Sequence, residues 1–304
     1  MSMESLPLVY IVLLAWNHLD DTVECLNSFL RTEYDNAHFL VVDNGSIDGT
    51  SEHIRKHYPE VEIITSAENL GIARGYNLGM EYALQKNAKY VLVANNDIIV
   101  GPDFLNKLVE QGEKNPHTGI LMPKIVYYDR PDRLWSTGAR KRPFPPAIVF
   151  IGLNKPDGPA YSKPRELEFA PSCVLLIKCE LMKKIGLFDG NFFFYWDDYD
   201  YCYRTRQVGY SINYVPNAVA RHKVSTSTRH SDRSHKWWEV WGRSTAIYYH
   251  KHESLPASIV QIAWITAREI LHGNFLRIPS FWKGVHLGFR EARTLHKGSD
   301  KTDS

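Results

Sequence analysis

The chain has few cysteines and no long apolar run, and both absences narrow what it can be. Its four cysteines are Cys25, Cys173, Cys179 and Cys202. They lack the Cys-x-x-Cys spacing of a zinc site and the density of a disulfide framework, so a reducing, cytoplasmic compartment is expected. No stretch approaches the roughly 18 apolar residues that a membrane-spanning helix needs.

Two further signatures are missing. The apolar run Leu8–Leu14 has no basic segment before it and no small-residue cleavage site after it, so we interpret it as a first strand rather than a signal peptide. Gly71, Gly75 and Gly79 do not have the Gly-x-Gly-x-x-Gly spacing of a dinucleotide-binding loop. They fit close packing of a helix on a strand, and approach of the backbone to a ligand, better.

The composition supports a sizeable core but distributes charge unevenly. Of the 304 residues, 44% are hydrophobic, which suits one large α/β domain with an appendage or two small domains. The net charge is +2, yet residues 221–304 carry 14 Lys and Arg against 7 Asp and Glu. This basic C-terminal segment favours an anionic partner, which could be phosphate groups or a membrane surface. The alternative is that it is an ordinary solvated face. No nucleic-acid partner is expected.

Strand and helix patterns alternate over the first part of the chain. Apolar runs at 8–14, 39–42, 61–65 and 90–94 are typical of buried strands, and helical spacing follows each. The fold class is therefore α/β, with βαβ units and a parallel sheet. Polar residues follow each strand, around Asn17, at Asp43 to Asp48, at Asn69 to Gly75 and at Asn95 to Asp97. Ligands bind at the carboxyl edge of such sheets, so this coincidence is a functional signal.

Beyond residue 118 the pattern loosens. We expect irregular strands and a mobile loop between Gly119 and Ala170, then a buried strand at Cys173–Lys178 and a short helix at Glu180–Ile185. A strand at Ser211–Val215 ends at Pro216, and helices rich in Trp, Tyr and His follow residue 233. The predicted division is a ligand-binding and catalytic domain at 1–230 and a helical segment at 231–304.

Two acidic stretches carry candidate chemistry. Asn95-Asn96-Asp97 ends a buried strand, where its carboxylate could hold a divalent cation against a ligand's phosphates or could simply form a turn. Asp197-Asp198-Tyr199-Asp200 follows a run of aromatic residues. Helix capping accounts for one of these Asp residues but not for the aromatic run. Aromatic faces beside carboxylates are suited to sugars, and a carboxylate there could act as general base on a hydroxyl.

These stretches together resemble the inverting family 2 glycosyltransferases of the GT-A fold, in their rhamnosyltransferase-like branch. The matching segments are VYIVLLAWN, VVDNGSIDGT, ENLGIARGYNLGM, VLVANNDIIV, GLFDGNFFFYWDDYDYCYRTRQVGY, and VPNAVARH with Ser225 and Ser227. They keep the family's order over about residues 8–227. The implied fold is a Rossmann-like, mostly parallel sheet flanked by helices, with a C-terminal helical extension.

The resemblance also implies site residues. Asp198 matches the presumed catalytic base, and Asp97 with His222 would hold Mg²⁺ or Mn²⁺, although a lone His is more often structural. Tyr195, Trp196 and Asp197 would meet the acceptor. The residues implied at the nucleotide-sugar donor are Asn17, Asp43, Asn44, Asp48, Asn69, Gly71, Arg74, Asn95 and Asn96. Asn95 stands where many relatives carry Asp, which weakens the expectation of strict metal dependence.

The implied reaction is an inverting transfer of a sugar to a hydroxyl of a cell-surface glycan or lipid-linked saccharide. Rhamnose from dTDP-rhamnose is the first expectation. The segment WDDYD also resembles the acidic motif of galactofuranosyl transferases, so UDP-galactofuranose is an alternative donor. A non-catalytic nucleotide-sugar or carbohydrate-binding protein is an alternative of another class, and Asn95 is its only support.

The C-terminal segment leaves three roles open. Ser254–Ile278 contains Ile259, Ile262, Ile265 and Ile270 with Trp264, and basic residues follow. Such a helix could lie peripherally on the inner face of the cell membrane, cover the main domain or form a homodimer contact.

Overall fold

The computed structural model describes residues 6–142, 147–224 and 235–299, with side chains up to residue 293. Its contacts divide the chain into two compact units. The first contains residues 6–140, 150–189 and 198–224 of the described chain, and the second contains 141–142, 147–149, 190–197 and 235–299. The predicted boundary at 230/231 lies outside the described residues. The short described segments 141–142, 147–149 and 190–197, which precede that boundary, group with the C-terminal helices.

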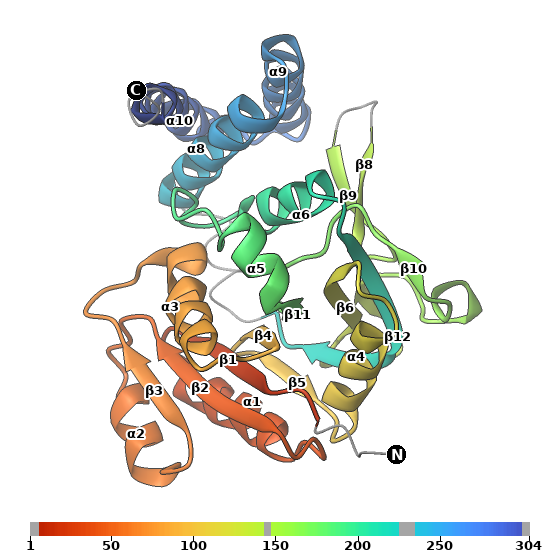
Figure 1. The fold of residues 1–304 in the computed structure, drawn as a ribbon. Coiled ribbons are helices and arrows are strands. Elements are labelled where there is room, and N and C mark those ends of the chain that lie inside the picture. Colours follow the sequence, from red (N-terminus) through yellow and green to blue (C-terminus); the bar gives the residue numbers. More distant parts are fainter. Residues whose placement is uncertain (1–5, 143–146, 225–234, 300–304) are drawn as a thin grey trace. The chain divides into compact units, whose positions relative to one another are not determined.

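The amino-terminal half of the first unit is built from βαβ units (Figure 1). Its parallel strands are β1 (Val9–Ala15), β2 (Ala37–Asp43), β3 (Glu62–Thr65) and β4 (Tyr90–Asn95). The helices between them are α1 (Leu19–Leu30), α2 (Thr50–His57) and α3 (Gly71–Gln85). All of β1 and the first five residues of β4 are buried, as expected for strands covered on both faces.

The other half extends the same sheet. Its strands are β5 (Ile98–Val100), β6 (Thr118–Tyr127), β7 (Leu134–Ser136), β10 (Arg165–Glu166), β11 (Val174–Lys178) and β12 (Ser211–His222). The strand order is β10-β12-β6-β11-β4-β1-β2-β3, with β5 paired to β12 and β7 to β6. Because β11 runs antiparallel to β4 and β6, the sheet is mixed, with a parallel majority around β1.

Shorter elements complete the framework. They are the helices α4 (Phe104–Glu113), α5 (Cys179–Ile185) and α6 (Asp197–Gln207), the 3₁₀ turn η1 (Pro159–Tyr161), and a strand pair of β8 (Ala139–Arg142) and β9 (Ala147–Phe150). Gly186 ends α5 with a φ of 76°, as predicted for a glycine stop.

Glycines bring α3 against the sheet. A Cβ at Gly79 would lie 2.3 Å from Val12 Cγ1, and one at Gly75 would lie 2.7 Å from Leu14 Cδ1. Only glycine permits this approach, so the prediction of close helix–strand packing at these two positions is confirmed. At the start of α3, Gly71 has a φ of 82°, which a residue with a side chain rarely adopts.

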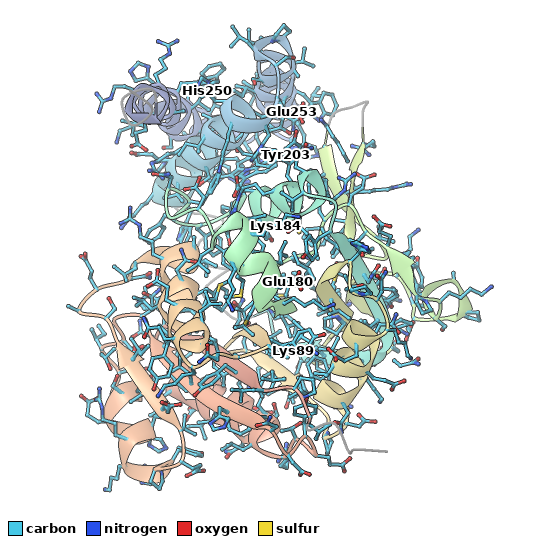
Figure 2. The ribbon with its side chains drawn as sticks, viewed as in Figure 1. Lys89, Glu180, Lys184, Tyr203, His250 and Glu253 are labelled. Carbon is cyan, nitrogen blue, oxygen red and sulfur yellow. The ribbon has the colours of Figure 1, made fainter. Side chains whose placement is uncertain are left out.

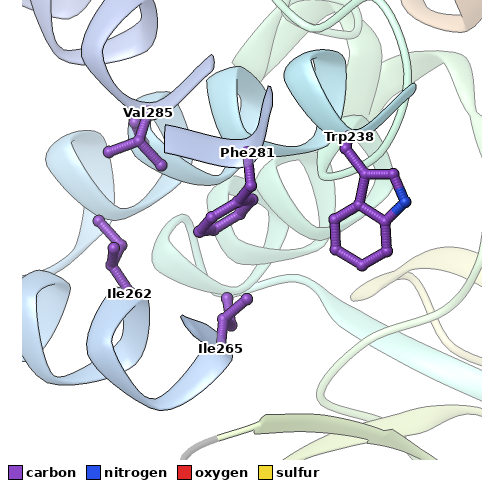
Figure 3. Packing of buried hydrophobic residues seen from close by; sticks show 6 residues of the cluster. Trp238, Ile262, Ile265, Phe281 and Val285 are labelled. Carbon is purple, nitrogen blue, oxygen red and sulfur yellow. The ribbon is translucent and has the colours of Figure 1, made fainter. Parts of the chain in front are cut away.

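The second unit contains α8 (His235–His252), α9 (Leu255–Leu271), the 3₁₀ turn η2 (Phe275–Arg277) and α10 (Ile278–Ser299). Ser254 caps α9, since its side chain accepts a hydrogen bond from the Ala257 N–H at 3.4 Å. The helices share a small apolar core of Trp238, Ala246, Ile262, Ile265, Phe281 and Val285 (Figure 3). No helix within the described ranges is both long and apolar enough to cross a membrane.

Two sequence-based predictions differ from the structure, and a third agrees with it. β6 has nine of its ten residues buried, but its register shifts against β12 and, between Ile125 and Val126, against β7, as predicted for irregular strands in this region. β12 continues through Pro216, and its register against β6 shifts between Val215 and Val219, because proline has no N–H for the ladder. The helix predicted to extend to Ile278 ends at Leu271, before Gly273 with a φ of 72°.

Candidate active site at the carboxyl edge of the sheet

The polar clusters do meet at one edge. In the strand register Ala15 lies opposite Asp43, Leu14 opposite Asn95 and Asp43 opposite Thr65. The loops that follow these strands therefore leave the sheet side by side. This edge is the one at which α/β proteins bind ligands, so the predicted placement of the clusters is confirmed.

The side chains after β2 organise the loop itself. Asp43 is 1% exposed and accepts hydrogen bonds from the Ser46 N–H, at 2.9 Å, and from the Ser51 hydroxyl. Asn44 is equally buried and joins this loop to the start of α3: it accepts from Leu70 N and donates to Gly71 O. Both residues therefore set the shape of the edge.

Asn69 and Arg74 frame the start of α3. The Asn69 side-chain oxygen accepts hydrogen bonds from the Gly71 N–H at 2.8 Å and from the Asn44 amide at 3.1 Å. Arg74 lies exposed in the first turn of the helix. A helix start offers N–H groups and a positive dipole end, which suits an anionic ligand, and the Arg74 guanidinium adds to that.

Asn17 and Asp48 tie the first two loops together. Asn17 has a φ of 55°, accepts from the Ile47 N–H and donates its own N–H to Ser46 Oγ. Asp48 accepts from Leu19 N and from Thr50. Partial burial works against the charged form of Asp48, but the hydrogen bonds from Thr50 and Leu19 outweigh it and lower the pKa of this carboxyl.

The turn after β4 uses its two amides in different ways. Asn95 accepts a hydrogen bond from the Tyr76 hydroxyl at 2.7 Å. Asn96 donates to the Thr22 hydroxyl at 2.8 Å and to the Asn17 carbonyl at 3.1 Å. The two amides therefore fix the turn against α3 and against the loop after β1. Asp97 is the one carboxylate of the Asn95-Asn96-Asp97 motif.

Asp97 and His222 form a buried pair. Asp97 Oδ2 lies 3.3 Å from His222 Nε2, and the two residues are 4% and 7% exposed. The indole of Trp135 packs edge-on against the imidazole, with ring centroids 4.6 Å apart. Within the described ranges, His222 Nδ1 is buried and has no hydrogen-bond partner. The structure thus brings together the two predicted metal ligands, Asp97 in the turn between β4 and β5 and His222 at the end of β12.

The pair fits a divalent cation that shares its coordination with phosphate. A carboxylate and an imidazole are both ligands of Mn²⁺, and Mg²⁺ commonly takes one or two carboxylates with the remaining positions left to substrate phosphate and water. The described part of the chain has no cluster of three or more His, Cys, Asp or Glu side chains able to hold a metal. The protein would therefore supply only part of the coordination shell.

Asp198 is the candidate base. Its carboxylate accepts hydrogen bonds from the Ser172 N–H at 3.3 Å and the Tyr199 N–H at 2.9 Å. Burial nevertheless raises the pKa of Asp198 to about 6, because the desolvation of the charged form exceeds the stabilisation from these bonds. A carboxylate with a pKa near neutrality can take up a proton during a reaction.

The other acidic residues of this motif differ from Asp198. Asp200 is fully buried and bonds to Arg204 Nε at 2.8 Å, while Arg204 also donates to the carbonyls of Ile185 and Leu187. This ion pair secures the segment before the aromatic run. Asp197 begins α6 and is 3% exposed.

The predicted acceptor-binding aromatics belong to the second unit. Tyr195 and Trp196 both have positive φ angles, 66° and 70°, which is a costly conformation for aromatic residues. Trp196 is 7% exposed, donates to the Thr245 hydroxyl at 3.0 Å and stacks on Tyr248 with centroids 4.6 Å apart. The indole is thus packed among helix residues rather than open at the surface.

One short segment connects the two carboxylates. The Ser172 N–H binds Asp198, and the next carbonyl, that of Cys173, accepts from the Asn95 N–H at 2.9 Å. Burial raises the pKa of the Cys173 thiol, and the negative charges of Asp97 and Asp198 raise it further. Asp198 and the turn that carries Asp97, 101 residues apart in the sequence, are therefore both adjacent to this segment.

The structure adds site residues that the sequence did not indicate. Lys223 forms ion pairs with Asp21, at 2.6 Å, and Glu24, and its N–H donates to the Asp97 carbonyl at 3.1 Å. Tyr76 and Trp135 hold Asn95 and His222 as described above. The only sequence signal for Lys223 is its position next to His222. Ser225 and Ser227, which matched the family, lie outside the described residues.

A mixed α/β sheet with a buried carboxylate–imidazole pair after β4 and a carboxylate of raised pKa at Asp198 has groups suited to binding a cation and to accepting a proton. The model of glycosyl transferase family 2 matches residues 10–186. The chain belongs to this family, and it is a glycosyltransferase of the GT-A fold.

Individual relatives agree with this assignment. The chain is 27% identical over 253 residues to an N-acetylglucosaminyl-diphospho-decaprenol L-rhamnosyltransferase of Mycobacterium tuberculosis, covering 76% of this chain and 80% of the relative. It is 23% identical over 232 residues to rhamnosyltransferase WbbL of Escherichia coli K12, covering 73% and 86%. The structure of GalNAc-T7 with UDP, GalNAc and Mn²⁺ superposes with a TM-score of 0.60 at 15% identity, over 81% of this chain and 50% of that one.

Proposed function

We propose that this glycosyltransferase transfers rhamnose from dTDP-rhamnose, with inversion, to a hydroxyl of a lipid-linked saccharide that becomes part of a cell-surface glycan. The relatives from Mycobacterium tuberculosis and Escherichia coli are both named as rhamnosyltransferases, and the first acts on a diphospho-decaprenol carrier by its name. Both matches extend over roughly three quarters of this chain. They support the sugar and the kind of acceptor.

Asp198 acts as the general base. With a pKa of about 6 it is ionised in most molecules at neutral pH and can still accept a proton. It removes the proton from the acceptor hydroxyl, whose oxygen bonds to the anomeric carbon from the face opposite the diphosphate. The bond from that carbon to the phosphate oxygen breaks, and the nucleoside diphosphate leaves with the electron pair. One displacement of this kind inverts the configuration.

Asp97 and His222 would hold Mg²⁺ or Mn²⁺. The cation would supply stabilisation of the negative charge that develops on the departing phosphate. The chain's own part is to keep the two ligands in place, through Trp135 against the imidazole and the Lys223 N–H on the Asp97 carbonyl. Asn95 uses its side-chain oxygen for the Tyr76 hydroxyl, so we assign it a structural role in the turn.

The loops at the sheet edge bind the nucleotide. Asp43, Asn44, Asn17 and Asp48 are held in a hydrogen-bonded framework, which keeps the edge ordered before the donor arrives. Arg74, exposed at the start of α3, is the basic side chain of this group, and its guanidinium suits the phosphates of the donor.

The observation that carries the proposal is the Ser172–Cys173 segment, which hydrogen-bonds to Asp198 and to Asn95, the strand residue just before the Asp97 turn. The test is a donor panel: purified protein, Mg²⁺ or Mn²⁺, and each nucleotide sugar, with release of nucleoside diphosphate as the readout. Turnover of dTDP-rhamnose is the expected result. Turnover of UDP-galactofuranose instead would favour the alternative that WDDYD suggests, and saturable binding without turnover, with a saccharide acceptor present, would favour a non-catalytic binding protein.

The proposed acceptor also suggests where the protein works. A lipid-linked saccharide is met at the membrane, so we place the enzyme peripherally on its cytoplasmic face. A homodimer is an alternative use of the C-terminal helices.

A further inference from the structure

The helix α9 exposes apolar residues where a surface helix normally exposes charge. Leu255, Ile259, Val260, Ile270 and Leu271 are 64%, 58%, 55%, 45% and 79% exposed. Ala263 and Ala267 lie between them and are also exposed. Residues spaced by three and four share one side of a helix, so these seven positions form a single face, here called the apolar face.

Three polar residues of α9 are buried on the other side of the helix. Ser258, Gln261 and Glu269 are 1%, 5% and 6% exposed. The buried Glu269 carboxylate is neutralised within the unit, since it binds Arg268 at 2.8 Å and accepts from the Asn274 amide at 2.9 Å. The helix thus buries a carboxylate and presents leucine and isoleucine to the surroundings, which is unfavourable in water.

The apolar surface continues past the end of α9. Phe275 and Leu276 in η2 are 60% and 80% exposed, and Trp282 in α10 is 46% exposed. Of the thirteen large apolar side chains exposed among the described residues, eight lie between Leu255 and Trp282. Such concentration on one unit marks an interaction surface rather than the scattered exposure that any protein has.

The positive charge of the second unit favours an anionic partner for the apolar face. Residues 235–293 carry eight Lys and Arg against four Asp and Glu. Every one of the four carboxylates has a basic partner: Glu239 with Lys283, Glu253 (labelled in Figure 2) with Lys141, Glu269 with Arg268, and Glu291 with Arg243. Lys236, Arg290 and Arg293 add exposed positive charge. A second copy would bring like charges together, whereas anionic headgroups complement them.

We propose that the apolar face of α9, continued by η2 and Trp282, docks on an anionic lipid surface. The apolar side chains enter the boundary between headgroups and acyl chains, and the basic residues of the unit attract the headgroups. A helix of 17 residues is about 25 Å long and would lie in the plane of the interface. The proposal deepens the peripheral location proposed above and names its surface.

Vesicle flotation of the full chain tests the docking. We expect it to float with vesicles of phosphatidylglycerol mixed with phosphatidylcholine and much less with phosphatidylcholine alone. The double variant Ile259→Glu, Leu271→Glu places two charges on the apolar face and should lower the bound fraction about tenfold or more. Leu153→Glu is the matched control, because Leu153 is 47% exposed in the first unit and its variant should bind as wild type does.

Three outcomes would overturn the docking surface. They are no flotation of the wild type, equal flotation of the double variant, and a wild-type dimer that becomes monomeric in the double variant without any vesicle binding. The last would assign the face to self-association. Thermal unfolding and circular dichroism check that the variants are folded, and Phe275→Ser with Leu276→Ser probes the same surface outside α9. Donor turnover in lipid-free solution is recorded in parallel, so that failure of docking and failure of the proposed catalysis are separated.

Discussion

At the scale of single residues, the environment of Asp198 sets it apart from the carboxylates beside it. Asp200 is paired with Arg204, whereas burial raises the pKa of Asp198 to about 6. Similar residues in one motif thus have different chemistry because their surroundings differ. Two predictions belong to this residue.

Replacing Asp198 with Asn should abolish turnover and keep donor binding. The amide keeps the size of the carboxylate but cannot accept the acceptor's proton, and general-base catalysis contributes about 10²–10⁴-fold to rates. Turnover is measured by nucleoside diphosphate release and donor affinity by calorimetry. Turnover close to wild type in the variant would remove Asp198 from the mechanism.

The rate of the wild-type enzyme should fall on the acid side near pH 6. A base with its usual pKa would remain ionised down to about pH 4, but the raised pKa of about 6 means that Asp198 is protonated and inactive below that value. A profile of kcat/KM between pH 5 and pH 8 should rise through about 6 and then level off. A profile flat over this range would contradict the assignment.

At the scale of elements, the end of β12 is fastened to α1 by Lys223. Partial burial opposes the charge of this lysine, but its hydrogen bonds to Asp21 and Glu24 raise its pKa to about 12. Tyr128 joins the same group, since its hydroxyl donates to Glu24 at 2.8 Å. The fastening keeps the residue after His222 against the Asp97 turn.

Lys223→Met should weaken metal binding without unfolding the protein. Both ion pairs are partly exposed, so the direct loss of stability is small, about 1 kcal/mol. The end of β12 loses its tether, and we expect Mn²⁺ affinity in the presence of nucleoside diphosphate to fall several-fold. Lys89→Met is the control: Lys89 (labelled in Figure 2) pairs with Glu113 on the surface at 2.6 Å, and its loss should leave Mn²⁺ affinity unchanged. Equal effects of the two variants would contradict this role of Lys223.

Gly79→Ala should destabilise the protein although alanine favours helices. The gain in helix propensity is about 1 kcal/mol, but the added Cβ would lie 2.3 Å from the buried Val12 side chain. Overpacking of this kind typically costs about 1–3 kcal/mol, so we expect a lower midpoint of thermal unfolding. Gly158→Ala, where no atom lies within 4 Å of the added Cβ, should leave the midpoint nearly unchanged. A rise in the midpoint for Gly79→Ala would show that α3 can move off the sheet.

At the scale of the whole molecule, ligand binding and folding are linked. A nucleoside diphosphate that binds only the folded state, at a concentration 100 times its dissociation constant, adds about 2.7 kcal/mol to the free energy of unfolding. We therefore expect dTDP with Mn²⁺ to raise the thermal midpoint, and dTDP with a chelator to raise it less. Calorimetry of the wild type checks both. Identical midpoints with Mn²⁺ and with chelator would argue against a metal at Asp97 and His222.

The sequence alone determined the elements and the edge of the sheet at which function lies. Apolar runs that end in Asn, Asp and Gly identify buried strands whose carboxyl ends open into loops, and this information is local. The same periodicity placed the start of α9 near Ser254 and the stop of α5 at Gly186. Two predictions were wrong because tertiary context outweighed the local pattern. β12 passes through Pro216, since a register shift accommodates the missing N–H, and α9 ends at Leu271 rather than continuing to Ile278.

Only the tertiary structure decided which polar residues bind one another and hold the loops at the edge of the sheet. Asn95 and Asn96 are the same residue type side by side, yet Asn95 accepts a hydrogen bond from Tyr76 and Asn96 donates one to Thr22. These partners are distant along the chain, so the sequence could not indicate them. The pairing of Asp97 with His222 and the raised pKa of Asp198 likewise depend on strands and burial that bring together distant parts of the chain. The apolar face of α9 was also visible only in the structure. Which side of a helix is exposed depends on how the helix packs and not on the spacing of its apolar residues in the sequence.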